Sequence, residues 1–450
     1  MTRGRHLAGS RRGLGSRFTM LYVGAAVSLL GTYVAYLTIP LVVLDLVQQA
    51  ESALPFSIAY ALETLPTLAF GLLGGVILDR VRLRWAMIVS NVVRALAFFY
   101  LAATFGTFTL GRVFAVAFVV GTFSAVYENA LFAIIPALVP SKDLARANGR
   151  IASTQAAMFA AGPALAGVLA SLGGTAPGLW LNGVAFALSS VAIYLIGPVG
   201  YLETQDEEER GGFIEETLNG LRFLVGERRL RDSTIAAAVA NLVFGFIEGT
   251  FVVMAMVVLG PVTEFQIGIL IVAFGLGSIA GASSADRVIR LLGLGRTMTV
   301  GVATMAIGMT LLVFSKFGPV ALGFAFVMFV GIGLVNVPIA TIRQVYTPPT
   351  MLGRVITASR ALSWGTLPIG ALVGGSLSTS LDYTQIVRAT PVLLLAVAVW
   401  LLTTPLWKDA FGPTHRRLRP SGDGDQRHAD RQETHPDPDH VESLQSERES

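Results

Sequence analysis

Long apolar segments alternate with short basic turns along most of the chain. A helix that crosses about 30 Å of hydrocarbon needs roughly 20 apolar residues, whereas membrane β-strands show shorter segments of alternating polarity. The apolar segments here are long and continuous, which predicts membrane-spanning helices. We expect twelve spans, over residues 18–44, 54–78, 85–106, 110–137, 151–172, 178–199, 233–259, 265–285, 297–316, 319–342, 356–380 and 390–407.

Two short motifs recur in the second half of the chain at nearly equal distances. Asp79-Arg80 returns as Asp286-Arg287, 207 positions later, and Gly149-Arg150 returns as Gly353-Arg354, 204 positions later. Internal repeats at a long, fixed period are typical of membrane transporters built from two similar halves. The sequence therefore predicts an all-α polytopic membrane protein with two pseudo-symmetric six-helix bundles.

The expected bundles cover residues 18–199 and 233–407, after a basic cytoplasmic N-terminus at 1–17. The linker at 200–232 carries apolar residues at helical spacing, which predicts an amphipathic helix. Such a helix lies on the membrane or the bundle, or acts as a partner-binding switch. The tail at 408–450 is almost free of apolar residues and is expected to be disordered. Its irregularly spaced histidines do not indicate a metal site.

Composition and charge agree with a membrane location. The chain is 53% hydrophobic and only 14% charged. Outside the spans and before the tail, 21 arginines and lysines fall on one face of the expected topology and 3 on the other. The positive-inside rule then places both termini in the cytoplasm and the protein in the cell membrane. The net charge of +4 reflects this topology and lipid contact, so no nucleic-acid partner is expected.

Several further motifs occur in a fixed order. They are the turn from Gly75 to Arg84, Ile135–Pro140 with Leu144–Asn148, Gly220–Leu224, and Leu352–Val355. In this order they resemble the major facilitator superfamily, specifically bacterial drug:proton antiporters of the macrolide-efflux and enterobactin-exporter type. The resemblance implies a secondary transporter that needs no cofactor. It would export a hydrophobic or amphipathic small molecule by alternating access, in exchange for protons.

Other functions remain open at this point. Export of an endogenous siderophore or secondary metabolite fits the same motifs. A polytopic membrane enzyme would need clustered catalytic groups, whereas the intramembrane acids here are scattered on different helices. A non-transporting sensor with the same fold is a further alternative. The absence of cysteine excludes disulfides and thiolate catalysis. The expected partners are a small molecule, protons and the lipid bilayer, and the expected oligomeric state is a monomer.

The resemblance also implies a latch between the halves. Asp79 ends the second span, and in similar proteins this residue pairs with the start of span eleven, which lies here near Arg354. Gly75, Arg80 and Arg84 belong to the same turn. A contact of this kind closes the inner mouth and breaks when the transporter opens inward.

Small residues and prolines allow helices to approach closely and to bend. By resemblance, spans two, five, eight and eleven form the interface between the halves. The candidate interface residues are Gly162, Pro163, Gly167, Pro368 and Gly374.

Ionisable residues at membrane depth are expensive and normally face a cavity or a partner. Glu248 and Glu63 lie at similar depths in spans seven and two, so we expect one of them, Glu248 first, to carry the coupled proton. Glu128 and Arg94 are close in depth on neighbouring spans. We expect them to form a structural ion pair.

A pocket for an apolar substrate combines aromatic surface with a few polar groups. Spans one, four, seven and ten line the cavity in similar proteins. The candidate substrate-cavity residues on these spans are Tyr33, Tyr36, Phe123, Tyr127, Asn241, Phe244 and Asn336.

Overall fold

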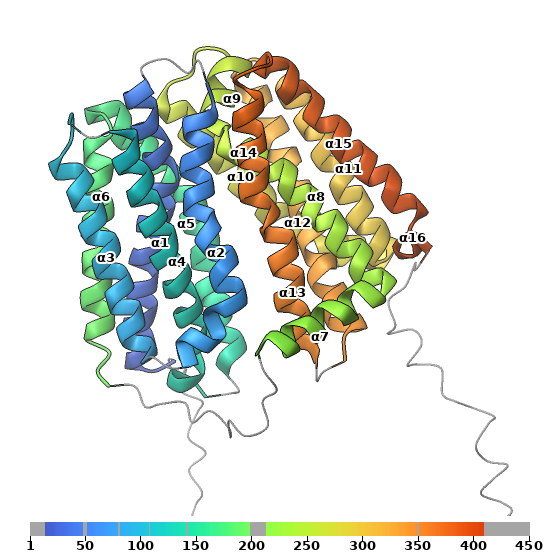
Figure 1. Ribbon diagram of the computed structural model, residues 1–450, viewed down its shortest axis with the longest axis horizontal. Helices are drawn as coiled ribbons and strands as arrows, with labels where there is room; N and C mark the ends of the chain where they lie inside the picture. Colours follow the sequence, from blue (N-terminus) through green and yellow to red (C-terminus); the bar gives the residue numbers. More distant parts are fainter. Residues whose placement is uncertain are drawn as a thin grey trace, which may run out of the picture. The chain divides into compact units, whose positions relative to one another are not determined.

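A computed structural model describes residues 14–47, 52–79, 82–107, 109–140, 143–198, 213–348 and 351–408; of residues 69–79, 145 and 213–218 it describes the backbone only. Every element within these ranges is a helix (Figure 1). The first thirteen residues, the start of the linker and the tail after residue 408 lie outside the description. The expectations for a basic N-terminus and a disordered tail therefore fall largely outside it.

The helices are α1 (Ser16–Val47), α2 (Leu54–Asp79), α3 (Leu83–Ala103), α4 (Leu110–Leu138), α5 (Leu144–Gly173), α6 (Ala176–Tyr194), α7 (Phe213–Gly226), α8 (Arg228–Gly249), α9 (Phe251–Val258), α10 (Glu264–Leu292), α11 (Leu294–Val313), α12 (Pro319–Tyr346), α13 (Leu352–Trp364), α14 (Thr366–Leu377), α15 (Tyr383–Thr403) and α16 (Pro405–Lys408).

Ten described helices are long and apolar enough to cross a membrane: α1, α3, α4, α5, α6, α8, α10, α11, α12 and α15. Helix α2, with 26 residues, is another span. Helices α13 and α14 follow one another directly and together make the last of twelve. The predicted all-helical, twelve-span architecture is confirmed.

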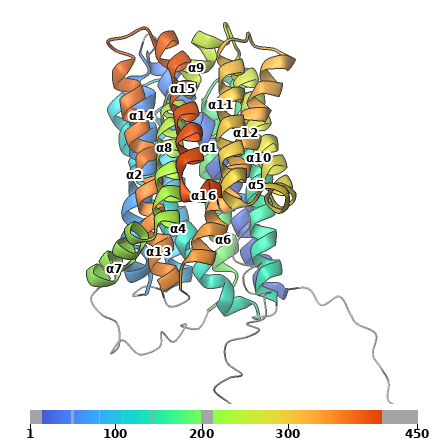
Figure 2. The ribbon, with the colours of Figure 1, turned by 90° about the vertical axis from the view of Figure 1, so that its right-hand side faces the viewer.

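The same helix contacts occur twice. In the first helix set, α1–α6, helix α1 packs on α5, α2 on α4, and α3 on α6. In the second helix set, α8–α16, the corresponding pairs are α8 with α14, α10 with α12, and α11 with α15. The two sets meet through α5 with α10 and through α2 with α14, as Figures 1 and 2 show. This repetition of contacts gives the fold its internal pseudo-symmetry.

Two spans are broken where the sequence analysis predicts continuous helices. Span seven breaks at Thr250, between α8 and α9, and span eleven breaks at Gly365, between α13 and α14. At the first break the Tyr383 hydroxyl donates to the Thr250 carbonyl over 3.2 Å. A backbone carbonyl freed inside a membrane protein needs such a partner, so the break is stabilised by the neighbouring helix α15.

Several helix ends differ from the predicted spans. The last span was expected at 390–407, but α15 covers Tyr383–Thr403 because Asp382 caps its start, accepting from the Thr384 backbone N–H at 2.8 Å. Helix α5 begins at Leu144 and α8 at Arg228, both before the predicted starts. Hydropathy marks only the apolar part of a helix, whereas hydrogen bonding continues to the cap.

An arginine closes the last helix of each set. Arg84 donates to the carbonyls of Ile193 and Tyr194, which end α6, and its guanidinium carbon lies 5.1 Å from the Tyr194 ring centre. In the second set, Arg296 donates to the Trp407 carbonyl over 3.3 Å and lies 5.3 Å from that ring centre. Cations stabilise helix C-termini, where the last carbonyls lack intrahelical partners.

Within the second set, α10 and α12 touch backbone to backbone. A Cβ added at Gly281 would overlap the Val330 carbonyl, and one added at Gly333 would overlap the backbone of Ala282. Only glycine permits this distance between the two helix axes. The crossing therefore depends on glycine at both positions.

Candidate functional site

A small cavity joins the two predicted proton-coupling acids. Glu63 of α2 and Glu248 of α8 both line it, which places acids from the two helix sets around one space. Its volume is about 20 Å³, which is room for about one water molecule. The other lining residues are Tyr36, Leu37, Ile39, Pro40, Phe56, Ala59, Tyr60, Gly249, Phe251 and Val252.

Glu248 is the more enclosed of the two acids. Its side chain lies in the last turn of α8, directly before the break at Thr250, and is only 7% exposed. Among the described residues its Oε1 has no hydrogen-bond partner, and no arginine or lysine nitrogen comes within 4 Å of either acid. Isolated carboxyl groups inside a membrane are expensive when charged and mark proton or ion pathways.

The two helix sets are in contact directly beside this cavity. The Ser57 hydroxyl of α2 donates to the Gly249 carbonyl over 3.1 Å. Nearby, the Ala53 backbone N–H donates to the Ser378 hydroxyl, also over 3.1 Å. We call this end of the molecule, where α2 begins and α14 ends, the far end, and the opposite end, where α7 packs on α13, the linker end (Figure 1). The far end is therefore closed beside Glu248.

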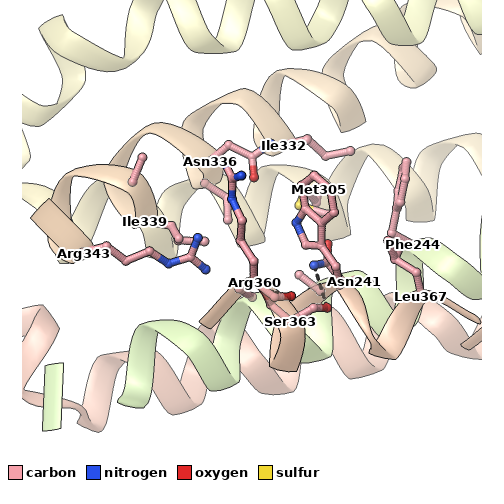
Figure 3. Close-up of a pocket in the computed structure, with 15 residues that line it drawn as sticks. Asn241, Phe244, Met305, Ile332, Asn336, Ile339, Arg343, Arg360, Ser363 and Leu367 are labelled. Carbon is pink, nitrogen blue, oxygen red and sulfur yellow. Dashed lines mark hydrogen bonds between the residues drawn. The ribbon is translucent and has the colours of Figure 1, made fainter. Parts of the chain in front are cut away.

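A larger cavity of about 390 Å³ lies within the second helix set (Figure 3). Helices α8, α11, α12, α13 and α14 line it. Three of the predicted substrate-cavity residues, Asn241, Phe244 and Asn336, are among its lining residues. The Asn241 amide is held in place because it donates to the Ser363 carbonyl over 2.9 Å. The remaining lining residues are Ala237, Ala240, Met305, Ile332, Val335, Ile339, Ala340, Arg343, Arg360, Trp364 and Leu367.

Arg343 and Arg360 in this cavity were not among the predicted site residues. Arg343 is one of the 21 arginines and lysines on the face that the positive-inside rule makes cytoplasmic, and Arg360 has no predicted role. Arg343 stands on α12, which also supplies Asn336, and Arg360 stands on α13, which also supplies Ser363. Their helical phase relative to Asn336 and Ser363 was the signal that could have identified them.

The remaining predicted cavity residues are spread over the first helix set. Tyr36 lines the small cavity with the two acids. Tyr33 packs edge-on against Phe159, at 5.4 Å between ring centres. Tyr127 is buried under Arg94, and Phe123 is half-buried on α4. The structure therefore does not gather the seven candidates in a single pocket.

The predicted ion pair between Glu128 and Arg94 is not formed, since no oxygen of Glu128 lies within 4 Å of the guanidinium nitrogens of Arg94. The guanidinium donates instead to Ser28 at 3.1 Å, to Ser124 at 3.2 Å and to the side-chain oxygen of Asn91. It also lies 4.2 Å from the Phe186 ring centre and 4.7 Å from that of Tyr127. Hydroxyl, amide and aromatic partners thus replace the expected carboxylate.

Arg94→Lys is expected to lower the stability of the protein by about 1–3 kcal/mol. Lysine keeps the buried charge but cannot stack a planar group on Phe186 or reach as many acceptors. Thermal unfolding in detergent measures the effect. Arg112→Lys is the matched control, because Arg112 is exposed and donates only to the Thr107 carbonyl. Equal melting temperatures for the two variants would contradict this account of Arg94.

The predicted latch is only partly described. Gly75 lies within α2, the Asp79 side chain is not described, and Arg80 lies outside the described residues. The predicted latch role of Arg84 is wrong, because its hydrogen bonds go to the end of α6 within the first helix set and do not reach α13. Arg354 stands in the first turn of α13, where its backbone meets Gly220 of α7. The linker helix thus packs on the proposed partner of Asp79.

The predicted interface residues divide between two roles. Gly167 lets α5 touch the backbone of Glu264 in α10, and the Pro163 carbonyl meets Gly268 of α10, so these two do lie between the helix sets. Gly162 packs against Tyr33 of α1, within its own set. In the second set, Gly374 packs against the Phe246 ring of α8, and Pro368 is buried in α14.

Comparisons with known proteins agree with this architecture. Residues 21–363 match the sequence profile of the Major Facilitator Superfamily. The multidrug efflux pump Tap of Mycolicibacterium fortuitum is 27% identical over 375 residues, 79% of this chain and 88% of that protein. Macrolide efflux protein A of Streptococcus pyogenes is 23% identical over 395 residues, 85% of this chain and 94% of that protein.

Among solved structures, the nucleoside transporter NupG superposes with a TM-score of 0.69 at 11% identity, covering 86% of this chain and 98% of that one. At this identity the likeness concerns the fold alone. The profile match covers most of the chain and agrees with the twelve spans and the doubled helix contacts. The chain is thus a member of the Major Facilitator Superfamily, a multi-pass membrane transporter and not an enzyme.

Proposed function

We propose that this protein exports a hydrophobic or amphipathic small molecule by alternating access, in exchange for protons. The observation that carries the proposal is the pairing of Glu63 and Glu248 in one small cavity between the two helix sets. The larger cavity, with Asn241, Phe244 and Asn336, would hold the substrate. Proton site and substrate site are then separate, but both are lined by α8.

Two relatives support the export of drug-like compounds, because they carry the names multidrug efflux pump and macrolide efflux protein. The identities of 27% and 23% support the class of substrate rather than a particular compound. A siderophore or secondary metabolite would use the same cavities.

The contacts of Ser57 with Gly249 and of Ala53 with Ser378 support a state closed at the far end. The distribution of arginines supports a cytoplasmic linker end, with both termini inside the cell. In this arrangement residues 18–199 and 233–407 are the two rocking bundles. We assign the inner latch to Asp79 and the start of α13, near Arg354.

Inside-out vesicles containing the protein should accumulate its substrate when an imposed gradient makes their interior acidic. The panel should contain a macrolide, an aromatic cation, an aryl carboxylate and an iron chelator of the siderophore type, measured by radiolabel or fluorescence. A protonophore should abolish the accumulation, since protons that leave the acidic vesicle interior supply the energy for substrate uptake. Accumulation that persists with the protonophore would refute proton exchange. Transport of the chelator alone would assign the metabolite-exporter role.

A further inference from the structure

Two arginine side chains reach into the larger cavity from different helices. Arg343 stands in the last turn of α12, and Arg360 stands on α13 (Figure 3). Arg343 is only 9% exposed, and its Nε is shielded from solvent without a hydrogen-bond partner. Arg360 is more exposed, and its guanidinium lies 5.6 Å from the Trp364 ring centre.

Neither guanidinium has an anionic partner in the part of the chain that the structure describes. No ion pair within 4 Å involves Arg343 or Arg360, and neither side chain donates a hydrogen bond to a described residue. Two described acids at the start of α8, Glu227 and Asp232, are engaged elsewhere. Glu227 pairs with Arg229 at 3.4 Å, and Asp232 pairs with Arg231 at 3.5 Å.

An unpaired, buried guanidinium is costly, because its charge and five N–H donors have left water without replacement. The charge of Arg360 on the same cavity wall adds repulsion to the cost of burying Arg343. The group that removes both costs is an anionic oxygen, which arginine binds with short, charge-assisted hydrogen bonds. Among the described residues no acidic side chain lines the cavity, and a bound anionic ligand would supply this oxygen.

Apart from Asn241, Asn336 and Ser363, the rest of the cavity wall is apolar. Phe244, Met305, Ile332 and Leu367 line the part away from Arg343 (Figure 3). A volume of about 390 Å³ lies within the range of small-molecule sites, roughly 300–1,000 Å³. The cavity therefore has a cationic end and an apolar body. A ligand that fits it carries an anionic group at one end and an apolar body at the other.

We infer that this cavity binds an amphipathic anion, with its anionic oxygens between Arg343 and Arg360 and its apolar body along Phe244 and Ile332. The inference rests on the proposed function and narrows its substrate class to molecules with an acidic group. Two sources share this chemistry: a free amphipathic solute and the headgroup of an anionic phospholipid. The cationic end of the cavity, with Arg343 in the last turn of α12, lies toward the linker end, the proposed cytoplasmic side.

Binding of dansylglycine to the protein in phosphatidylcholine nanodiscs tests the inference directly. Dansylglycinamide is the matched probe, because it keeps the apolar body and lacks the charge. Titrations followed by dansyl fluorescence should give an affinity for dansylglycine about tenfold or more above that for the amide, since charge-assisted hydrogen bonds are lost with the amide. Equal affinities would overturn the inference.

Variants locate the site. Arg343→Gln and Arg360→Gln should each weaken dansylglycine binding about tenfold while leaving the amide unaffected. Because Arg360 is exposed, Arg360→Gln should fold normally and tests the site if Arg343→Gln does not fold. Arg388→Gln is the control, because Arg388 is an exposed residue of α15 that packs over Phe314. Loss of binding in the control, or unchanged binding in both cavity variants, would overturn the assignment.

A second arm separates the two sources. Nanodiscs with phosphatidylglycerol should compete with dansylglycine if the occupant is a lipid headgroup, and should leave its binding unchanged if the occupant is a solute. These titrations need no gradient, so they are independent of the vesicle assay. Charge-independent binding together with protonophore-sensitive export would reject the anion site alone. Anion binding without export would reject the proposed transport instead.

Discussion

In vesicles that contain Glu248→Gln, proton-driven accumulation of substrate should fall at least about tenfold below that of the unchanged protein. Glutamine has the shape of protonated glutamate but cannot release a proton. In the structure Glu248 is buried without a hydrogen-bond partner on its Oε1, beside the contact of Ser57 with Gly249. A change in its charge would therefore act directly where the two helix sets meet.

The same vesicles should still exchange substrate across the membrane without a gradient, because the larger cavity is separate from Glu248. Counterflow of labelled against unlabelled substrate measures this exchange. Glu264→Gln is the matched control, since Glu264 lies in the first turn of α10 and lines neither cavity. If Glu248→Gln still couples normally and Glu63→Gln does not, Glu63 would be the residue that carries the coupled proton.

Gly281→Val should reduce the yield of folded protein severely. The added side chain would overlap the Val330 carbonyl where α10 and α12 touch, and overpacking of this kind costs about 1–3 kcal/mol or more. Backbone cannot swing aside as a flexible side chain can. The two helices must separate, and the larger cavity, partly lined by α12, should deform with them.

Gly323→Val is the control for helix propensity, because Gly323 lies on α12 with no atom within 4 Å of the position of an added Cβ. It should fold with close to normal yield. Size-exclusion profiles of fluorescent fusions and thermal unfolding in detergent compare the two variants. Similar profiles for both would show that the close crossing of α10 and α12 is not required.

The sequence predicted the doubled twelve-span fold because apolar length and repeated motifs are properties of the chain itself. It did not predict the breaks at Thr250 and Gly365. Those depend on a partner from another helix, such as the Tyr383 hydroxyl that bonds the Thr250 carbonyl. Tertiary contacts of this kind leave no periodic pattern in one segment.

The prediction of site residues was uneven for a related reason. Depth along a span can be counted, so Glu63 and Glu248 were correctly placed at one level, and the structure puts both on one cavity. Spacing along a helix shows which residues share a face, but it does not show which face meets the cavity. Arg94 was therefore given Glu128 as a partner when it faces Ser28, and Arg343 was not recognised as a cavity residue.

The arginines that close α6 and α15–α16 bear on how the protein is made. Arg84 finds its acceptors at Ile193 and Tyr194, all within the first 198 residues. Arg84 and its acceptors all precede the second helix set in the chain, so this contact needs no residue that is synthesised later. Arg296 repeats the arrangement with Trp407, near the end of the described chain. Each half therefore satisfies carbonyls at its own end with an arginine of its own, without a residue from the other half.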